Sequence, residues 1–147
     1  MDALLRALAP YVGRVCGAIA LDRGDDAMQE TFIAVLRNLR SLREPAAVRG
    51  WVRRIAVREA VRAAGVQPQT VEPAAWESAV DDVDVATAVD VWAVLERLTP
   101  EHRAVLVLRD LDGLEEATVA ELLELPAGTV KSRLHRARKA FAERWDR

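Results

Sequence analysis

A cluster of hydrogen-bond donors lies near the carboxyl end of the chain, on a segment with helical spacing of its apolar residues. Val130, Leu134 and Ala137 recur at intervals of four and three residues, which gives one narrow apolar stripe on an α-helix. The opposite face is cationic and hydroxylic, so its chemistry is the binding of phosphates or base edges. Its donors are Lys131, Ser132, His135, Arg136 and Lys139.

A short amphipathic segment precedes this basic helix. Residues 119–123 have the spacing of a short helix, and Glu124, Leu125 and Pro126 interrupt it before the basic helix begins. Short helix, tight turn and basic helix are the layout of a helix-turn-helix, whose second helix enters the major groove of DNA. The helix pattern alone leaves a plain solvated cationic face open as an alternative.

The remaining polar residues form no catalytic or metal-binding pattern. His102 and His135 have no cysteine or carboxylate arrangement that suggests zinc or general-base chemistry, and the sequence has no glycine-rich phosphate loop. Cys16 is the single cysteine, which excludes an internal disulfide and fits a reducing cytoplasm. Its apolar neighbours favour a buried side chain over a reactive thiol. We therefore expect a cytoplasmic protein that is not an enzyme and holds no cofactor or metal.

The formal net charge of −2 conceals a strong charge pattern. Residues 1–65 hold 11 arginines against seven acidic side chains, whereas residues 66–100 hold one arginine against seven. Residues 129–147 hold seven basic side chains against two acidic ones. A near-neutral sum argues against a tight autonomous DNA binder and fits a subunit whose DNA affinity is supplied by a larger partner. No apolar run approaches the roughly 20 residues that span a bilayer, so we expect no membrane insertion.

Helical periodicity dominates the chain, and we find no strand pattern. The sequence predicts an all-α protein with two small helical domains, at residues 1–65 and 87–147, joined by an acidic linker at 66–86. Pro10 falls inside the first expected helix, where it can kink the helix or delay its start. The expected helices cover about 2–21, 25–42 and 47–64 in the first domain, and 87–97, 101–111, 115–124 and 127–145 in the second.

Caps and apolar spacing also predict how the first domain packs. Asp25 or Asp26 can cap the second helix, and Gly65 ends the third. The expected inward-facing residues are Phe32, Val35, Leu36 and Leu39 in the second helix, and Val48, Trp51, Val52, Ile55 and Ala56 in the third.

The second domain resembles region four of bacterial sigma factors, and the extracytoplasmic-function (ECF) group most closely. The resemblance runs from Leu98-Thr99-Pro100 through Leu111-Asp112-Gly113-Leu114 to the basic helix, Gly128 to Arg138. It implies a four-helix domain that recognises the −35 promoter element. Lys131 and Arg136 could contact either guanine O6 and N7 or phosphates, and both readings stay open. For His135, a solvent-exposed side chain with no DNA contact is as good an interpretation as a DNA contact. Relatives often carry Gly at Glu124, where a positive φ costs another residue about 1 kcal/mol. The implied contacts are Thr129, Lys131, Ser132, Arg133, His135 and Arg136.

The first domain is similar to sigma region two, a three-helix domain. Residues 26–32, Asp-Ala-Met-Gln-Glu-Thr-Phe, resemble the segment that docks on the clamp of the RNA polymerase β′ subunit. The resemblance assigns that contact to Asp26, Gln29, Glu30 and Thr31. Asp26 with Gln29 also has the outline of a capping box, which is the alternative for these two residues.

Residues 49–56, Arg-Gly-Trp-Val-Arg-Arg-Ile-Ala, resemble the region-two helix that engages the −10 element. Such a helix needs cations along the backbone and apolar faces for unstacked bases. Trp51 is either that stacking face or, as its apolar neighbours favour, a core residue. Arg58 stands where relatives often have Asn, which puts −10 specificity in doubt because Arg offers only donors. The implied −10 contacts are Arg49, Arg53, Arg54, Arg58 and Arg62.

The resemblance as a whole implies a minimal ECF-type sigma factor. Its partners would be the β′ clamp and β flap of core RNA polymerase, promoter DNA and an anti-sigma protein. Two alternatives stay open: a stand-alone helix-turn-helix regulator of the LuxR type, and a sigma-like protein that acts by protein–protein interaction without initiating. The linker acids Asp81, Asp82 and Asp84 are either a nucleic-acid mimic or a solubilising spacer.

Overall fold

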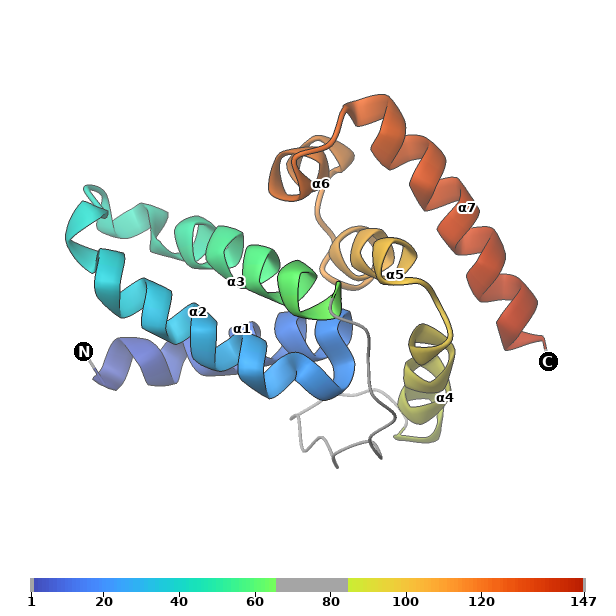
Figure 1. The fold of residues 1–147 in the computed structure, drawn as a ribbon, viewed down its shortest axis with the longest axis horizontal. Coiled ribbons are helices and arrows are strands. Elements are labelled where there is room, and N and C mark those ends of the chain that lie inside the picture. The colour runs from blue at the N-terminus through green and yellow to red at the C-terminus, as the bar shows by residue number, and fades with distance from the viewer. Residues whose placement is uncertain (1, 66–84, 147) are drawn as a thin grey trace. The chain divides into compact units, whose positions relative to one another are not determined.

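The computed structural model of the protein describes residues 2–65 and 85–146. The chain divides into two compact units, Met1–Ser78 and Ala79–Arg147. The described residues of both units are helical and contain no strand, which confirms the predicted all-α class (Figure 1).

The predicted limits of the domains and linker, 1–65, 66–86 and 87–147, stay a prediction. Most of the linker, including Asp81, Asp82 and Asp84, lies outside the described residues. The last two linker positions are an exception, because helix α4 already begins at Val85.

Over residues 2–65, the first unit is a bundle of three α-helices that each pack on the other two (Figure 1). Its centre is made of apolar side chains with no exposed surface, among them Val12, Ile19, Val35 and Val52. The elements are α1 (Asp2–Ala20), η1 (Leu21–Arg23), α2 (Gly24–Asn38), η2 (Leu39–Ser41), η3 (Pro45–Ala47) and α3 (Val48–Ala64). Burial of this kind supplies the main driving force for folding.

The turn from α1 to α2 brings two backbones unusually close. Leu21, the first residue of η1, has a φ of 56°, a left-handed conformation that L-residues rarely adopt. A Cβ atom added to Gly24 would lie 2.8 Å from the Cα atom of Gly17, so the two helices approach glycine against glycine. Pro10, by contrast, is accommodated inside α1 without ending it.

Helix α2 corrects three predictions. It begins at Gly24 and no side chain caps it, so the predicted capping by Asp25 or Asp26 is wrong. It ends at Asn38, with a 3-10 turn up to Ser41, where the sequence predicted one helix to about residue 42. Leu36 was expected in the core but is 48% exposed. The buried stripe is Ala27, Thr31 and Val35, and Leu36 lies about 100° away from it.

Helix α3 has the predicted limits and ends at Gly65, whose N–H donates to the Val61 carbonyl at 3.0 Å. Trp51, expected in the core, is only half-buried at the edge of the buried stripe. That stripe consists of Val52, Ala56, Val57, Ala60 and Ala64.

The second unit contains α4 (Val85–Glu96), α5 (Pro100–Leu106), a π-helical turn η4 (Val107–Leu111), α6 (Glu116–Leu123) and α7 (Ala127–Trp145). The predicted helix over 101–111 is therefore an α-helix followed by a π turn. Thr99 caps α5 by accepting the His102 N–H at 3.3 Å. Arg103 is 5% exposed and donates to the carbonyls of Leu95 (3.4 Å) and Leu98 (3.1 Å), which fixes the end of α4 on α5.

Helices α6 and α7 form the predicted helix-turn-helix (Figure 1). Glu124 follows α6 with a φ of 55° and a ψ of 45°. This is the left-handed conformation expected at a position where relatives often carry Gly. The Leu125 N–H donates to the Ala120 carbonyl at 3.0 Å, and extended Pro126 leads into α7. The tight turn is thus closed by backbone bonds at the cost of one strained residue.

One expectation about membranes was too strict. An apolar window within Asp2–Ser41 has a mean hydropathy of 1.4, long and apolar enough to span a bilayer. Half of this window is buried inside the molecule, and α1 packs on both α2 and α3. Such burial is the pattern of a core helix.

Candidate nucleic-acid interface and partner surface

Helix α7 buries its apolar stripe and exposes its donors, as the sequence predicted. Val130, Leu134 and Ala137 are at most 1% exposed, so they fix the rotation of the helix on its unit. Thr129 and Arg133 are half-buried at the edges, and the Ser132 hydroxyl donates to the Thr129 carbonyl at 3.2 Å. The predicted contacts that face solvent are Lys131, Ser132, His135 and Arg136.

Helix α5 adds a histidine to the electrostatics of this face. Burial, followed by the charges of Arg136 and Arg133, holds the pKa of His102 below its ordinary value of 6.5. His102 is therefore neutral at pH 7. The positive charge of the α7 face therefore comes from its arginines and from Lys131 and Lys139, and the neutral histidine adds no repulsion to them.

One contact of α7 was not anticipated from the sequence. Arg138 forms a two-pronged ion pair with Asp110 of the π turn, with Nε–Oδ2 and Nη2–Oδ1 distances of 2.9 and 2.7 Å. The bond from Arg138 holds the pKa of Asp110 below its ordinary value of 3.8. Local periodicity carries no signal for a pair 28 residues apart.

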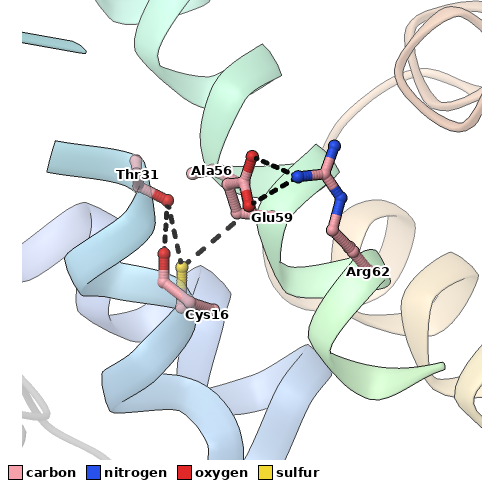
Figure 2. A network of polar contacts seen from close by, with 6 residues as sticks. Cys16, Thr31, Ala56, Glu59 and Arg62 are labelled. Atoms are coloured by element: carbon pink, nitrogen blue, oxygen red, sulfur yellow. Dashed lines mark hydrogen bonds and ion pairs between the residues drawn. The ribbon is translucent and has the colours of Figure 1, made fainter. Parts of the chain in front are cut away.

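The arginines predicted to engage the −10 element line α3, but they are not equivalent. Arg49, Arg54 and Arg58 are exposed. Arg53 is half-buried, and within the described part of the chain its buried Nε has no hydrogen-bond partner. Arg62 is paired with Glu59, with a distance of 3.4 Å to Oε1, so part of its charge is offset (Figure 2).

A buried polar network removes one predicted contact residue. Thr31 has no exposed surface, and its hydroxyl donates to the Ala27 carbonyl at 2.7 Å. Figure 2 shows it beside the Cys16 thiol, which lies 3.9 Å from both the Thr31 hydroxyl and the Ala56 carbonyl. Thr31 therefore cannot contact a partner, because the stripe that packs α2 into the unit includes it.

Cys16 is fully buried in this network, as its apolar neighbours indicated. Burial is the main cause that raises the pKa of its thiol to about 11 from an ordinary value of 9.0. Since the thiolate is the reactive form, this cysteine is inert in the folded protein.

The outer side of α2 is mixed polar and apolar. Asp26, Gln29 and Glu30 are exposed, as expected for residues that contact a partner. Ile33 and Leu36 follow them at helical spacing and are 38% and 48% exposed. We call these five residues the α2 surface. Ile33 is not among the predicted contacts and Leu36 is predicted in the core, although α2 has more apolar positions than one buried stripe can hold.

Comparison with known proteins places both units in one family. Residues 2–65 match the Sigma-70 region 2 family, and residues 88–141 match Sigma-70, region 4. The ECF RNA polymerase sigma-E factor of Haemophilus influenzae is 31% identical over 151 residues, covering 88% of this chain and 80% of that relative. This chain belongs to the ECF sigma factors.

Other ECF sigma factors are similar over less of their length. SigM of Mycobacterium tuberculosis is 36% identical over 121 residues, with 80% of this chain and 62% of SigM covered. SigE of Mycolicibacterium smegmatis is 32% identical over 155 residues, with 97% of this chain and 60% of SigE covered. The chain thus spans about three fifths of these mycobacterial relatives.

Two solved structures share the fold. The sigma factor RpoE in complex with the anti-sigma factor NepR, from Bartonella quintana, superposes with a TM-score of 0.68 at 21% identity, covering 99% of this chain and 96% of RpoE. CnrH, solved with the cytosolic domain of CnrY, gives 0.65 at 20% identity, covering 99% and 86%. The region-two match over residues 2–65 leaves a stand-alone LuxR-type regulator without support.

Proposed function

We propose that this ECF sigma factor binds core RNA polymerase and directs promoter-specific initiation, as a cytoplasmic subunit without enzyme activity of its own. One observation carries the proposal: α7 exposes Lys131, His135 and Arg136 from a helix-turn-helix whose apolar stripe is fully buried. A helix held in this way can enter the major groove without exposing its core.

In this proposal α7 reads the −35 element. Lys131 and Arg136 are exposed cations that suit guanine O6 and N7 or nearby phosphates. Thr129 lies in the first turn of α7, where its hydroxyl can donate to a phosphate and the positive end of the helix dipole favours an anion. Ser132, Arg133 and His135 complete the contact from the same helix, Arg133 with the less exposed side chain.

Helix α3 would engage the −10 element. Its exposed arginines, Arg49, Arg54 and Arg58, suit the backbone of a melted strand. Trp51 is half-buried beside them, so part of its ring is available for stacking on a base. Arg53 and Arg62 contribute less, because the first is half-buried and the second is shared with Glu59.

The α2 surface would dock on the clamp of the polymerase β′ subunit. An apolar patch rimmed by polar groups is typical of a protein–protein contact, and its acids make it a poor DNA surface. In the second unit, an open apolar groove of about 320 Å³ between α4 and α7 suits an apolar segment of the β flap. Its walls are Val91, Phe141, Ala142, Trp145 and Asp146, and the rings of Phe141 and Trp145 stack at 5.9 Å.

An anti-sigma protein is the further partner that we propose. RpoE and CnrH, which share this fold, were each solved with a bound partner, and that of RpoE is an anti-sigma factor. The α2 surface and the α4–α7 groove are the apolar areas that such a partner would cover. A pull-down from native cells should recover a second protein besides polymerase, and recovery of polymerase alone would count against this partner.

Arg58 favours one alternative function, a sigma-like protein that binds polymerase without initiating. It is exposed on α3 at a position where the family often has Asn, and it offers a base edge only donors. If the alternative holds, the chain binds core polymerase but yields no transcript, and Arg58→Asn restores some.

Run-off transcription tests the proposal. Purified core polymerase is incubated with genomic promoter fragments, with and without this chain. We expect promoter-specific transcripts that depend on the chain and are lost with Lys131→Ala or Arg136→Ala. Arg97→Ala is the matched control, since Arg97 is an exposed cation of the same unit outside α7. Absence of both transcripts and core binding would overturn the proposal.

A further inference from the structure

Arg138 occupies a position on α7 where a DNA contact would be expected. Lys131, His135 and Arg138 follow one another at intervals of four and three residues, so they share one side of the helix. The guanidinium of Arg138 nevertheless binds a side chain of its own unit. Its Nε–H and one Nη2–H donate to the two carboxylate oxygens of Asp110, at 2.9 and 2.7 Å.

The two-pronged geometry makes this contact directional. Two parallel N–H to carboxylate bonds fix the plane of the guanidinium as well as its distance. The side chains are 50% and 36% exposed, so solvent screens the charge attraction and the geometry is the more important feature.

Asp110 is attached to the core of its unit. It lies in the π turn Val107–Leu111, in which Val107 and Leu108 are at most 3% exposed. Two backbone hydrogen bonds close the turn. The Asp112 N–H donates to the Val107 carbonyl at 2.8 Å, and the Leu114 N–H donates to the Leu108 carbonyl at 3.0 Å. A π turn is wider than an α turn and often marks a functional position in a helix. The carboxylate is therefore a fixed point against which α7 can be held.

We propose that Arg138 and Asp110 form a strut that sets the angle of α7 in the major groove, so that Arg138 is a positioning residue for base recognition. The inference rests on the proposed −35 recognition. Base edges are read only when side chains lie within about 0.5 Å of the productive geometry. Phosphate contacts fix the register of a protein on DNA but do not read its sequence. Loss of the strut should therefore reduce discrimination between sequences more than total binding.

Two substitutions separate the strut from simple electrostatics. Asp110→Asn removes an anion and Arg138→Gln removes a cation, so charge alone predicts opposite changes in DNA affinity. The strut predicts that both substitutions lower discrimination. Glu143→Gln and Arg97→Gln are the matched controls, because they make the same charge changes at exposed positions of the second unit that are not among the proposed DNA contacts.

Discrimination is measured as a ratio of two dissociation constants. The full-length chain selects duplexes from a randomised pool, and each variant is titrated with the selected duplex and with the unselected pool. We expect Asp110→Asn and Arg138→Gln each to lower the ratio about tenfold, the value of one well-placed base contact. The controls should change it less than twofold, and the double variant Asp110→Arg with Arg138→Asp should restore it.

If Arg138→Gln weakens binding to the selected duplex and to the unselected pool equally, the strut is overturned and Arg138 is a phosphate contact. Thermal melting followed by circular dichroism checks that each variant folds. If Arg138→Gln does not fold, Arg138→Lys replaces it, because lysine keeps the charge but cannot form the bidentate pair. Arg138→Lys should lower the ratio of the two dissociation constants in the same way.

Failure of the proposed function would be recognised separately. A wild-type chain that selects no sequence would contradict −35 recognition. The strut is then judged without DNA, from the NMR signal of the Arg138 Nε–H. We expect this proton to exchange slowly in the wild type and rapidly in Asp110→Asn, and rapid exchange in the wild type would overturn the strut.

Discussion

Cys16 shows how burial changes the chemistry of one residue. Its pKa is about 11 in the folded chain and 9.0 when exposed, so above pH 9 the unfolded state loses a proton that the folded state keeps. Deprotonation then favours the unfolded state. The free energy of unfolding should fall between pH 9 and 11 by up to about 1.4 kcal/mol per pH unit. Denaturant titrations of wild type and Cys16→Ala measure this, and equal pH slopes would contradict it.

Gly24 is a second residue whose identity the packing dictates. Alanine normally stabilises a helix relative to glycine, yet a Cβ at Gly24 would lie 2.8 Å from the backbone of Gly17. Gly24→Ala should therefore lower the free energy of unfolding by about 1–3 kcal/mol. Gly50→Ala is the control, because nothing lies within 4 Å of its added Cβ, and it should stabilise α3 by roughly 0.5–1 kcal/mol. Stabilisation by both changes would show that α1 and α2 can separate freely.

At the scale of elements, the turn before α7 carries a strained residue. Glu124 has a φ of 55°, which glycine adopts without a steric penalty. Glu124→Gly should raise the free energy of unfolding by about 1 kcal/mol, whereas Glu124→Ala, which also removes the charge, should not. Denaturant unfolding of both variants tests this, and an equal gain would assign the effect to charge.

Helix α2 packs into its unit on one side and, in our proposal, contacts polymerase through the α2 surface on the other. Ile33→Ser with Leu36→Ser should change the free energy of unfolding by less than about 0.5 kcal/mol per site. The same pair should weaken core polymerase binding more than about tenfold, because apolar contacts at a docking centre dominate affinity. Val61→Ser is the matched control, since Val61 is 40% exposed on α3. A similar loss of binding with the control would indicate nonspecific stickiness.

Among the elements, the features with a local sequence signal could be predicted and the others could not. The limits of α3 and α7 follow from apolar spacing, Gly65 and Pro126, because these signals are local. Thr31 was assigned to a partner by resemblance, although Ala27, Thr31 and Val35 already had the spacing of a buried stripe. The π turn was not predictable, because a single turn with i→i+5 hydrogen bonds leaves no mark on the apolar spacing. The pairing of Asp110 with Arg138 was not predictable either, because two residues 28 positions apart share no local pattern.

For the whole molecule, the surfaces that suit DNA and the surface that suits polymerase lie on different helices. The cationic faces of α3 and α7 each suit one promoter element, and the α2 surface suits polymerase. A net charge of −2 gives the free chain little general attraction to DNA, so polymerase would supply much of the affinity. The matches to Sigma-70 regions 2 and 4 and the similarity to known ECF sigma factors establish the family, whereas the division of tasks is our proposal.

The most direct test of this division measures core polymerase binding and run-off transcription side by side for two variants. Arg136→Ala should bind core polymerase as the wild type does and lose promoter-specific transcripts. Ile33→Ser with Leu36→Ser should lose both core binding and transcripts while staying folded. Unchanged promoter selection by Arg136→Ala, or wild-type core binding by the double variant, would contradict the account.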